Sequence, residues 1–273
     1  MMRLGDGRVW QRGFGVAVAL CAVAYLLNIT LSEVEPGNVW SLSYGIAATV
    51  LLFGVLLFGV RRRVLRLASK YRLGRSRAWL SFHIYGGGLF LLLVLMHSGF
   101  QWPSGVVTWW LWALSLWTVA SGLVGLALQT WIPRVLASGL STEVLYERIP
   151  EMVEEIRRRA QTLVASCDEP VQTLYTRQLA PTFDQPRRRW IYFYDITGGI
   201  RSRLKEFRYL SGLLTPEEKE KLVELEQLYR TKLEMDAHYT LQQPLRLWLY
   251  THVPTSLALL AFLAMHLFSV LYY

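Results

Sequence analysis

Five long apolar runs constrain this chain more than any other feature of its sequence. A helix needs about twenty apolar residues to cross the hydrocarbon core of a bilayer, and hydrophobic residues make up 53% of the chain. The runs cover residues 13–31, 39–60, 79–100, 106–129 and 247–272. Because backbone polar groups in lipid must be satisfied within their own segment, each run predicts a helix. We therefore expect an all-α integral membrane bundle of five transmembrane helices.

The apolar runs and the long polar segment between the fourth and fifth of them divide the chain into three predicted parts. Residues 1–131 hold four spans, residues 132–245 form a mostly helical cytoplasmic insertion between the fourth and fifth spans, and residues 246–273 hold the fifth span.

Two helix starts stand out within the predicted insertion. Ser141 or Thr142 opens an amphipathic stretch that Pro150 is expected to break or kink. Thr215 followed by Pro216 is a typical capping residue with proline at the first helical position.

The placement of basic residues predicts the orientation. All 29 Lys and Arg fall in the N-terminal tail, between Arg61 and Arg77, or between Arg134 and Arg246. Lys and Arg concentrate in cytoplasmic loops, so the N-terminus is expected inside and the C-terminus outside a bacterial cytoplasmic (inner) membrane. This pattern, with attraction to anionic membrane lipid, accounts for the net charge of +9, so we expect no nucleic-acid partner.

Four of the five histidines recur at one spacing. His83 and His97 lie fourteen residues apart in the third run, and His252 and His266 repeat that spacing in the fifth. Fourteen helical residues advance ~21 Å and return to within about 40° of the starting direction, so each pair shares one helix face. The predicted topology makes the two spans parallel, with His83 level with His252 and His97 level with His266. We predict two bis-imidazole haem sites, since a metal without haem would find only two ligands at each level.

Small and basic residues near the histidines suit a porphyrin. Gly86, Gly87 and Gly88 follow His83 within five residues, and their missing side chains would let a flat macrocycle approach. Plain helix packing is the alternative for these glycines. Arg246 precedes the fifth span and is a candidate partner for haem propionates, although a boundary arginine can equally extend its head group toward water.

The paired H-x13-H spacing on two non-adjacent, parallel spans resembles the di-haem membrane cytochromes b. The likeness is greatest to the transmembrane core of ferric reductases and NADPH oxidases, and looser to the cytochrome b subunits of quinol-oxidising complexes. It implies that His83 and His252 bind the iron of an inner haem, that His97 and His266 bind the iron of an outer haem, and that electrons cross the membrane between them.

The sequence also departs from the reductase families. It lacks their flavin and nucleotide-binding module and has neither a G-x-G-x-x-G nor a P-loop pattern, so the electron donor is expected to be a quinol or a separate subunit. It has no C-x-x-C-H pattern for covalent attachment, so both haems are expected to be non-covalent haem b.

These features predict an electron-transfer subunit of a larger oxidoreductase rather than an enzyme acting alone. It would link a quinone pool or a cytoplasmic donor to an extracytoplasmic acceptor such as a multihaem cytochrome c. Two alternatives stay open, a self-sufficient transmembrane reductase of ferric iron or oxygen and a haem-free scaffold or carrier. A bound quinone also stays open, with His238 near Asp236 as a candidate proton acceptor. A solvated or helix-packed histidine is the favoured alternative for His238.

Overall fold

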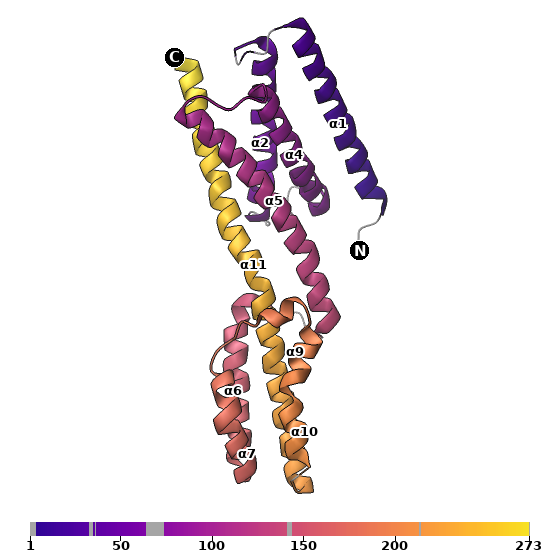
Figure 1. Cartoon of the computed structure of the whole chain (residues 1–273), viewed down its shortest axis with the longest axis vertical. Coiled ribbons are helices and arrows are strands. Elements are labelled where there is room, and N and C mark those ends of the chain that lie inside the picture. The colour runs from indigo at the N-terminus through magenta and orange to yellow at the C-terminus, as the bar shows by residue number, and fades with distance from the viewer. Residues whose placement is uncertain are drawn as a thin grey trace. The chain divides into compact units, whose positions relative to one another are not determined.

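The computed structural model describes residues 4–32, 35, 37–63, 74–140, 144–212 and 214–272. Every regular element in these ranges is a helix (Figure 1), which confirms the predicted all-α class. Five helices are long and apolar enough to cross a membrane, as expected of a multi-pass membrane protein. These five are α1 (Leu4–Leu31), α2 (Val39–Arg63), α4 (Ser76–His97), α5 (Val106–Gly139) and α11 (Pro216–Tyr272).

Shorter helices connect α5 to α11. They are η1 (Tyr146–Arg148), α6 (Ile149–Ala165), α7 (Glu169–Leu174), η2 (Tyr175–Leu179), α8 (Ala180–Phe183), η3 (Trp190–Phe193), α9 (Ile196–Arg203) and α10 (Lys205–Ser211). The predicted helix start at Ser141 or Thr142 lies outside the described residues, as does most of the basic connection after α2.

The chain forms two compact units. The first unit comprises residues 1–123 and 251–273, and the second comprises residues 124–250. Both α5 and α11 contribute to both units. The domain boundaries expected near residues 131 and 245 therefore fall inside continuous helices.

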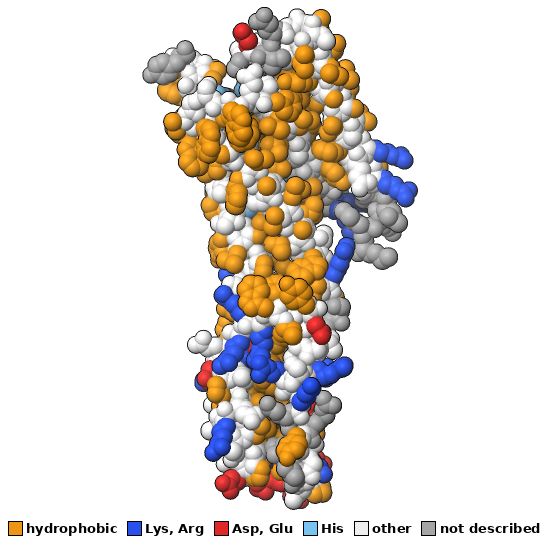
Figure 2. All heavy atoms as spheres, in the orientation of Figure 1, with side chains coloured by type: hydrophobic (Ala, Val, Ile, Leu, Met, Phe, Trp, Pro, Cys, Tyr) orange, Lys and Arg blue, Asp and Glu red, His pale blue; other side chains and the backbone are white. Residues whose placement is uncertain are grey.

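In the first unit α4 packs along α2 and also contacts α1 (Figure 1). A small apolar core joins α2 and α4 to the last part of α11. Its buried members are Tyr44, Ala48, Leu52, Phe90, Leu93, Met96, Leu259 and Leu263. Most other apolar side chains of this unit point outward, and hydrophobic atoms cover much of its visible face in Figure 2. Such a surface suits hydrocarbon rather than water.

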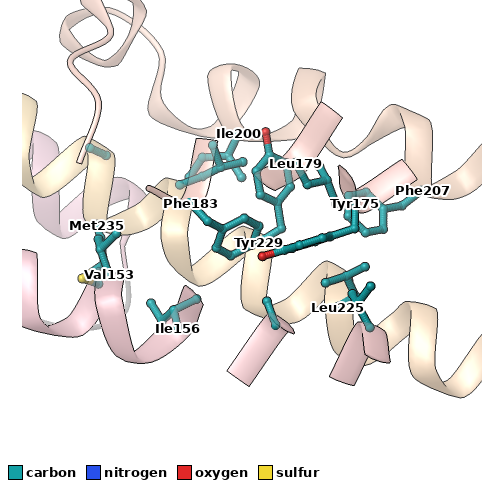
Figure 3. Packing of buried hydrophobic residues seen from close by; sticks show 14 of the residues in the cluster. Val153, Ile156, Tyr175, Leu179, Phe183, Ile200, Phe207, Leu225, Tyr229 and Met235 are labelled. Atoms are coloured by element: carbon teal, nitrogen blue, oxygen red, sulfur yellow. The ribbon is translucent and has the colours of Figure 1, made fainter. Parts of the chain in front are cut away.

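The second unit has a larger core made by α6 to α10 and its own part of α11 (Figure 3). Val153 and Ile156 recur on the inner face of α6, as the 3.6-residue period requires. The ring of Phe183 lies 5.7 Å from the ring of Tyr229 and 5.9 Å from that of Tyr175. The part of the unit from α6 to α10 buries a broad set of apolar side chains, as a domain in water does, whereas Trp131 of α5 and Trp190 of η3 are exposed.

Three prolines near the expected boundaries lie within helices. Pro133, next to the expected start of the insertion at residue 132, lies inside α5, and Pro244, next to its expected end at residue 245, lies inside α11. A proline within a helix removes one backbone hydrogen bond, but the bonds on either side keep both helices continuous. Pro150 neither breaks nor kinks a helix, because α6 begins at Ile149 and Pro150 occupies its first turn, where the amide has no partner to lose.

The start of α11 follows its sequence signal. The helix begins at Pro216, and the Thr215 hydroxyl donates to a Glu218 carboxylate oxygen at 3.2 Å. The Thr215 backbone N–H donates to the same carboxylate oxygen at 3.3 Å, which is one of the two contacts of the capping-box pattern. From there the helix runs for 57 residues to Tyr272.

The third span is displaced from its expected position. It covers Ser76–His97, whereas the apolar run extends to Phe100. Gly99 and Phe100 adopt left-handed backbone conformations with φ of 61° and 57°, and the Phe100 amide donates back to the Leu95 carbonyl at 2.8 Å. This turn ends α4 at its second candidate ligand, His97.

Candidate functional site

The structure brings the four candidate histidines of the first unit together as two pairs. The ring centroids of His83 and His252 lie 6.4 Å apart, and those of His97 and His266 lie 6.3 Å apart. Within each pair the ring planes are steeply inclined, at 71° and 76°. Since the lower-numbered histidine of α4 meets the lower-numbered histidine of α11, the two helix segments run parallel.

The centroid distances can be compared with those expected for two kinds of metal geometry. An imidazole nitrogen lies ~2.0–2.1 Å from a metal that it binds and the ring centroid ~1.1 Å beyond, so ligands on opposite sides of one metal place their centroids ~6.3 Å apart. Two ligands of a tetrahedral site would place them only ~5.1 Å apart. The two observed distances match the opposed arrangement. Unliganded rings also pack at such distances, so the hydrogen bonds of the rings matter.

Helix α2 holds both imidazoles of α4 through backbone carbonyls. Nδ1 of His83 lies 3.0 Å from the Val55 carbonyl oxygen, and Nδ1 of His97 lies 2.8 Å from that of Ser41. The Ser41 hydroxyl also donates to the His97 carbonyl at 2.8 Å. Ser41 and Val55 are themselves fourteen residues apart, so α2 offers one carbonyl at the level of each pair.

Helix α5 holds one imidazole of α11 through a hydroxyl. Nδ1 of His252 lies 2.8 Å from the Ser121 hydroxyl oxygen, whose own hydrogen is donated to the Thr118 carbonyl at 3.0 Å. Three of the four imidazoles are thus oriented by a second residue.

The carbonyl partners fix the tautomer of the two α4 rings. A carbonyl oxygen only accepts, so Nδ1 of His83 and of His97 carries the hydrogen. In each neutral ring Nε2 is then left with its lone pair, the form in which imidazole binds a metal.

A glycine allows the close approach of His97 to α2. A Cβ atom added to Gly45 would lie only 2.9 Å from His97 Nδ1. Gly45 follows Ser41 by one helical turn, so any side chain there would push the imidazole off the Ser41 carbonyl. Gly59 follows Val55 in the same way, but an added Cβ there would meet nothing within 4 Å.

The three consecutive glycines of α4 have different surroundings. A Cβ atom on Gly86 would lie 3.0 Å from a Val55 methyl group, and one on Gly88 would lie 3.5 Å from the Phe14 ring. Both positions therefore serve contact with neighbouring helices. An added Cβ on Gly87 would meet nothing within 4 Å. Gly87 lies one turn from His83, so among the three it is the one that leaves space beside an imidazole.

Apolar side chains separate the two histidine levels. Phe90 on α4 and Leu259 and Leu263 on α11 are buried between them. Water is therefore excluded from the region between the two pairs, where the electric field of any charge would be little screened.

Arg246 belongs to the second unit and has protein partners there. Its guanidinium lies 4.4 Å from the centroid of the Tyr146 ring, 3.5 Å from a Glu147 carboxylate oxygen and 3.3 Å from the Tyr250 hydroxyl. These contacts hold the arginine between η1 and α11. They account for its position without a propionate.

Asp236 is committed to Lys232 rather than to His238. Its carboxylate accepts from Lys232 Nζ at 2.8 and 2.9 Å and from the Arg187 amide at 2.7 Å, with both side chains completely buried. Burial raises the pKa of Asp236 and lowers that of Lys232, and their mutual attraction opposes both shifts. His238 is only 2% exposed and lies beside Gln242. Residues two apart on a helix point in nearly opposite directions.

Sequence reasoning missed the residues that orient the imidazoles. Ser41 and Ser121 are buried polar residues in otherwise apolar helices, and their depth, level with a histidine, is a signal that could have identified them. The Val55 carbonyl leaves no such signal, because every residue type carries one. Among the described residues no cluster of three or more His, Cys, Asp or Glu side chains could hold a metal ion, so the pairs are the candidate sites.

Comparison of the chain with protein-family models, with curated proteins and with solved structures finds no match.

Proposed function

We propose that the first unit is a membrane cytochrome that binds two non-covalent b-type haems. His83 and His252 would ligate one iron through Nε2, and His97 and His266 the other. The observation that carries this proposal is the separation of 6.4 and 6.3 Å within two histidine pairs. The Nδ1 contacts and the space beside Gly87 fit the same group.

Haem iron supplies one-electron redox chemistry when it is bound. The chain's own contribution is to orient the imidazoles. Hydrogen bonds to Nδ1 increase the basicity of the ligand nitrogen and fix the rotation of the ring. The apolar residues between the levels keep water away from both sites. Two histidines at each level would hold each iron through two protein nitrogens, a ligand set that favours electron transfer over reaction of oxygen or another substrate.

We therefore favour an electron-transfer subunit over a self-sufficient reductase. The charge pattern supports a topology with the N-terminus inside, so that His83 and His252 lie toward the cytoplasm. Electrons would pass between a quinone pool or cytoplasmic donor on that side and an extracytoplasmic acceptor, such as a multihaem cytochrome c, on the other. The partners would be further subunits of a redox complex.

The test is the haem content of the purified full-length protein. A pyridine haemochrome spectrum with a protein assay should give about two haems per chain, and about one in His97→Ala, because one of two bis-histidine sites loses a ligand. His238→Gln is the matched control, since it removes the histidine outside the pairs. It should retain both haems.

Other outcomes would redirect the proposal. A wild-type chain without a Soret band would contradict it and leave a haem-free scaffold or carrier. Two haems that survive His97→Ala would place the ligands elsewhere. Rapid reduction of oxygen or ferric iron by the isolated protein with quinol would support the self-sufficient reductase instead.

A further inference from the structure

The second unit presents a patch of exposed aromatic and basic side chains around η3. It consists of Arg187, Arg188, Trp190, Ile191 and Tyr194, and we call it the η3 patch. Trp190 is 81% exposed and Tyr194 is 91% exposed. Large aromatic side chains left in water expose apolar area without compensation, so a cluster of them indicates a binding surface.

The backbone beneath the patch is fixed from inside. The Arg187 amide donates to the buried Asp236 carboxylate at 2.7 Å, and the Arg189 amide donates to the Thr240 hydroxyl at 3.1 Å. Tyr192 is completely buried in the core of the unit. These three contacts fix the backbone of residues 187–192 beneath the exposed side chains. The exposure of the η3 patch is therefore built into the fold of the second unit.

The patch continues an apolar helix surface. The Phe193 ring stacks on the Trp131 ring of α5 with centroids 6.0 Å apart and planes 9° apart, and the Trp190 ring lies 5.6 Å from that of Phe193. Trp131 belongs to the part of α5 inside the second unit, within a candidate membrane span that extends to Ala137. The patch thus lies where an apolar helix ends, the level at which Trp and Tyr meet lipid head groups.

The charge of the patch is positive. Arg187 and Arg188 are exposed in it, and Arg134 is exposed near the end of α5. The nearest acidic residues in sequence have other partners, because Asp184 lies 3.8 Å from Arg157 and Asp195 caps α9 through the Gly198 amide at 2.7 Å. Figure 2 shows Lys and Arg side chains gathered on the visible face of this unit.

We propose that the η3 patch binds anionic phospholipid head groups. Trp190, Ile191 and Tyr194 would enter the interfacial layer, and Arg187 and Arg188 would contact the phosphates. A basic residue near an anionic membrane surface is attracted to the lipid phosphates, and arginine suits phosphate through paired N–H donors. This surface is independent of the histidine pairs, so the proposal does not depend on haem binding.

The test measures quenching of Trp190 fluorescence by brominated lipid. The full-length protein is placed in nanodiscs of phosphatidylcholine and phosphatidylglycerol, with bromine carried by one lipid or by the other at equal content. The difference between wild type and Trp190→Phe isolates the Trp190 signal. We expect stronger quenching when phosphatidylglycerol carries the bromine. Arg187→Gln combined with Arg188→Gln should abolish that preference.

The matched control is Lys205→Gln combined with Lys219→Gln, which removes the same charge from exposed positions elsewhere on the second unit. It should leave the preference intact, and far-UV circular dichroism checks that all variants fold. Equal quenching by both lipids would overturn the anionic head-group site. Absence of quenching would overturn lipid contact altogether and favour a protein partner on the patch.

Discussion

The two units of this chain differ in where their apolar and polar side chains lie. The first unit turns most of its apolar side chains outward and keeps its polar contacts inside, at the histidine pairs and their oxygen partners. The second unit buries a broad apolar core, exposes its charges and encloses the ion pair of Lys232 with Asp236. Each arrangement fits a different solvent, hydrocarbon for the first unit and water for the second.

This difference determines what a buried polar residue indicates in each unit. In lipid a polar side chain needs a partner, so a buried serine or histidine in the first unit marks a specific contact. In the second unit buried polar groups anchor segments such as the one that carries the η3 patch. The same residue type therefore has a different meaning in each unit, and substitutions can test this.

The largest effect is expected from Lys232→Met. It leaves the Asp236 carboxylate buried without its cation, which should cost about 3–5 kcal/mol of unfolding free energy. Replacing both residues, Lys232→Met with Asp236→Leu, should recover only part of that loss, because it removes the buried charge but also the acceptor of the Arg187 amide. Unfolding of the full chain in mild detergent measures both. A Lys232→Met variant as stable as the wild type would show that the ion pair does not stabilise the second unit.

The same variant has a predicted pH dependence. Burial already raises the pKa of Asp236 above 3.8, against the attraction of Lys232 and the N–H and charge of the neighbouring arginines. A raised folded-state pKa contributes stability that is complete below the unfolded pKa and is lost as pH rises through the folded value. Without Lys232 the pKa rises further, so stability should fall more between acid and neutral pH than in wild type. An unchanged pH profile would contradict this.

A second substitution pair compares the solvents of the two units directly. Val23 on α1 and Val223 on α11 are 54% and 52% exposed. Val23→Lys should cost about 2.5–3.5 kcal/mol of insertion free energy, the range for lysine near the centre of a membrane helix. Val223→Lys should change stability by no more than about 0.5 kcal/mol. Yield in the membrane fraction measures the insertion of each variant, and thermal unfolding measures its stability. Equal effects of the two substitutions would contradict the assignment of different solvents to the two units.

A third prediction concerns the approach of α2 to His97. Gly45→Ala should displace the imidazole and weaken one haem site toward the upper end of the ~10–100-fold range for residues that orient a ligand. Gly59→Ala adds the same methyl group one turn after Val55, the residue whose carbonyl contacts His83. The methyl group meets open space there, so both haems should stay bound. Haem titration of the apoprotein separates the sites. Equal loss in the two variants would indicate a general effect on the helix.

The smallest effect is expected at Ser121. Ser121→Ala removes the hydroxyl that contacts His252 Nδ1, which should weaken the site of His83 and His252 about 10-fold. It should also raise the midpoint potential of that haem, because a less basic imidazole donates less electron density to iron. Ser121→Thr should restore both properties. Redox titration is the readout, and a potential unmoved by Ser121→Ala would assign the hydroxyl to helix packing alone.

Patterns that recur along the chain allowed part of this structure to be predicted. Hydropathy is summed over twenty residues, so it located five spans despite errors at their ends. The expected boundary at residue 132 falls inside α5, because the one hydrogen bond lost at Pro133 does not outweigh the intact bonds around it. The spacing of His83 and His97 placed them on one face, but the partners of their rings depend on which helix packs alongside. No pattern within α4 carries that information.

The length of α2 between two of its carbonyl oxygens matches the spacing of the two histidine levels. Its two carbonyl oxygens, at Ser41 and Val55, stand at the same fourteen-residue interval as the imidazoles they hold. Because the backbone provides the contact, side-chain replacements along α2 can leave it in place wherever they leave room for the rings. Insertion of a single residue between the two positions would instead turn one carbonyl by about 100° and shift it by ~1.5 Å. The segment from 41 to 55 is therefore constrained in its length more than in its composition.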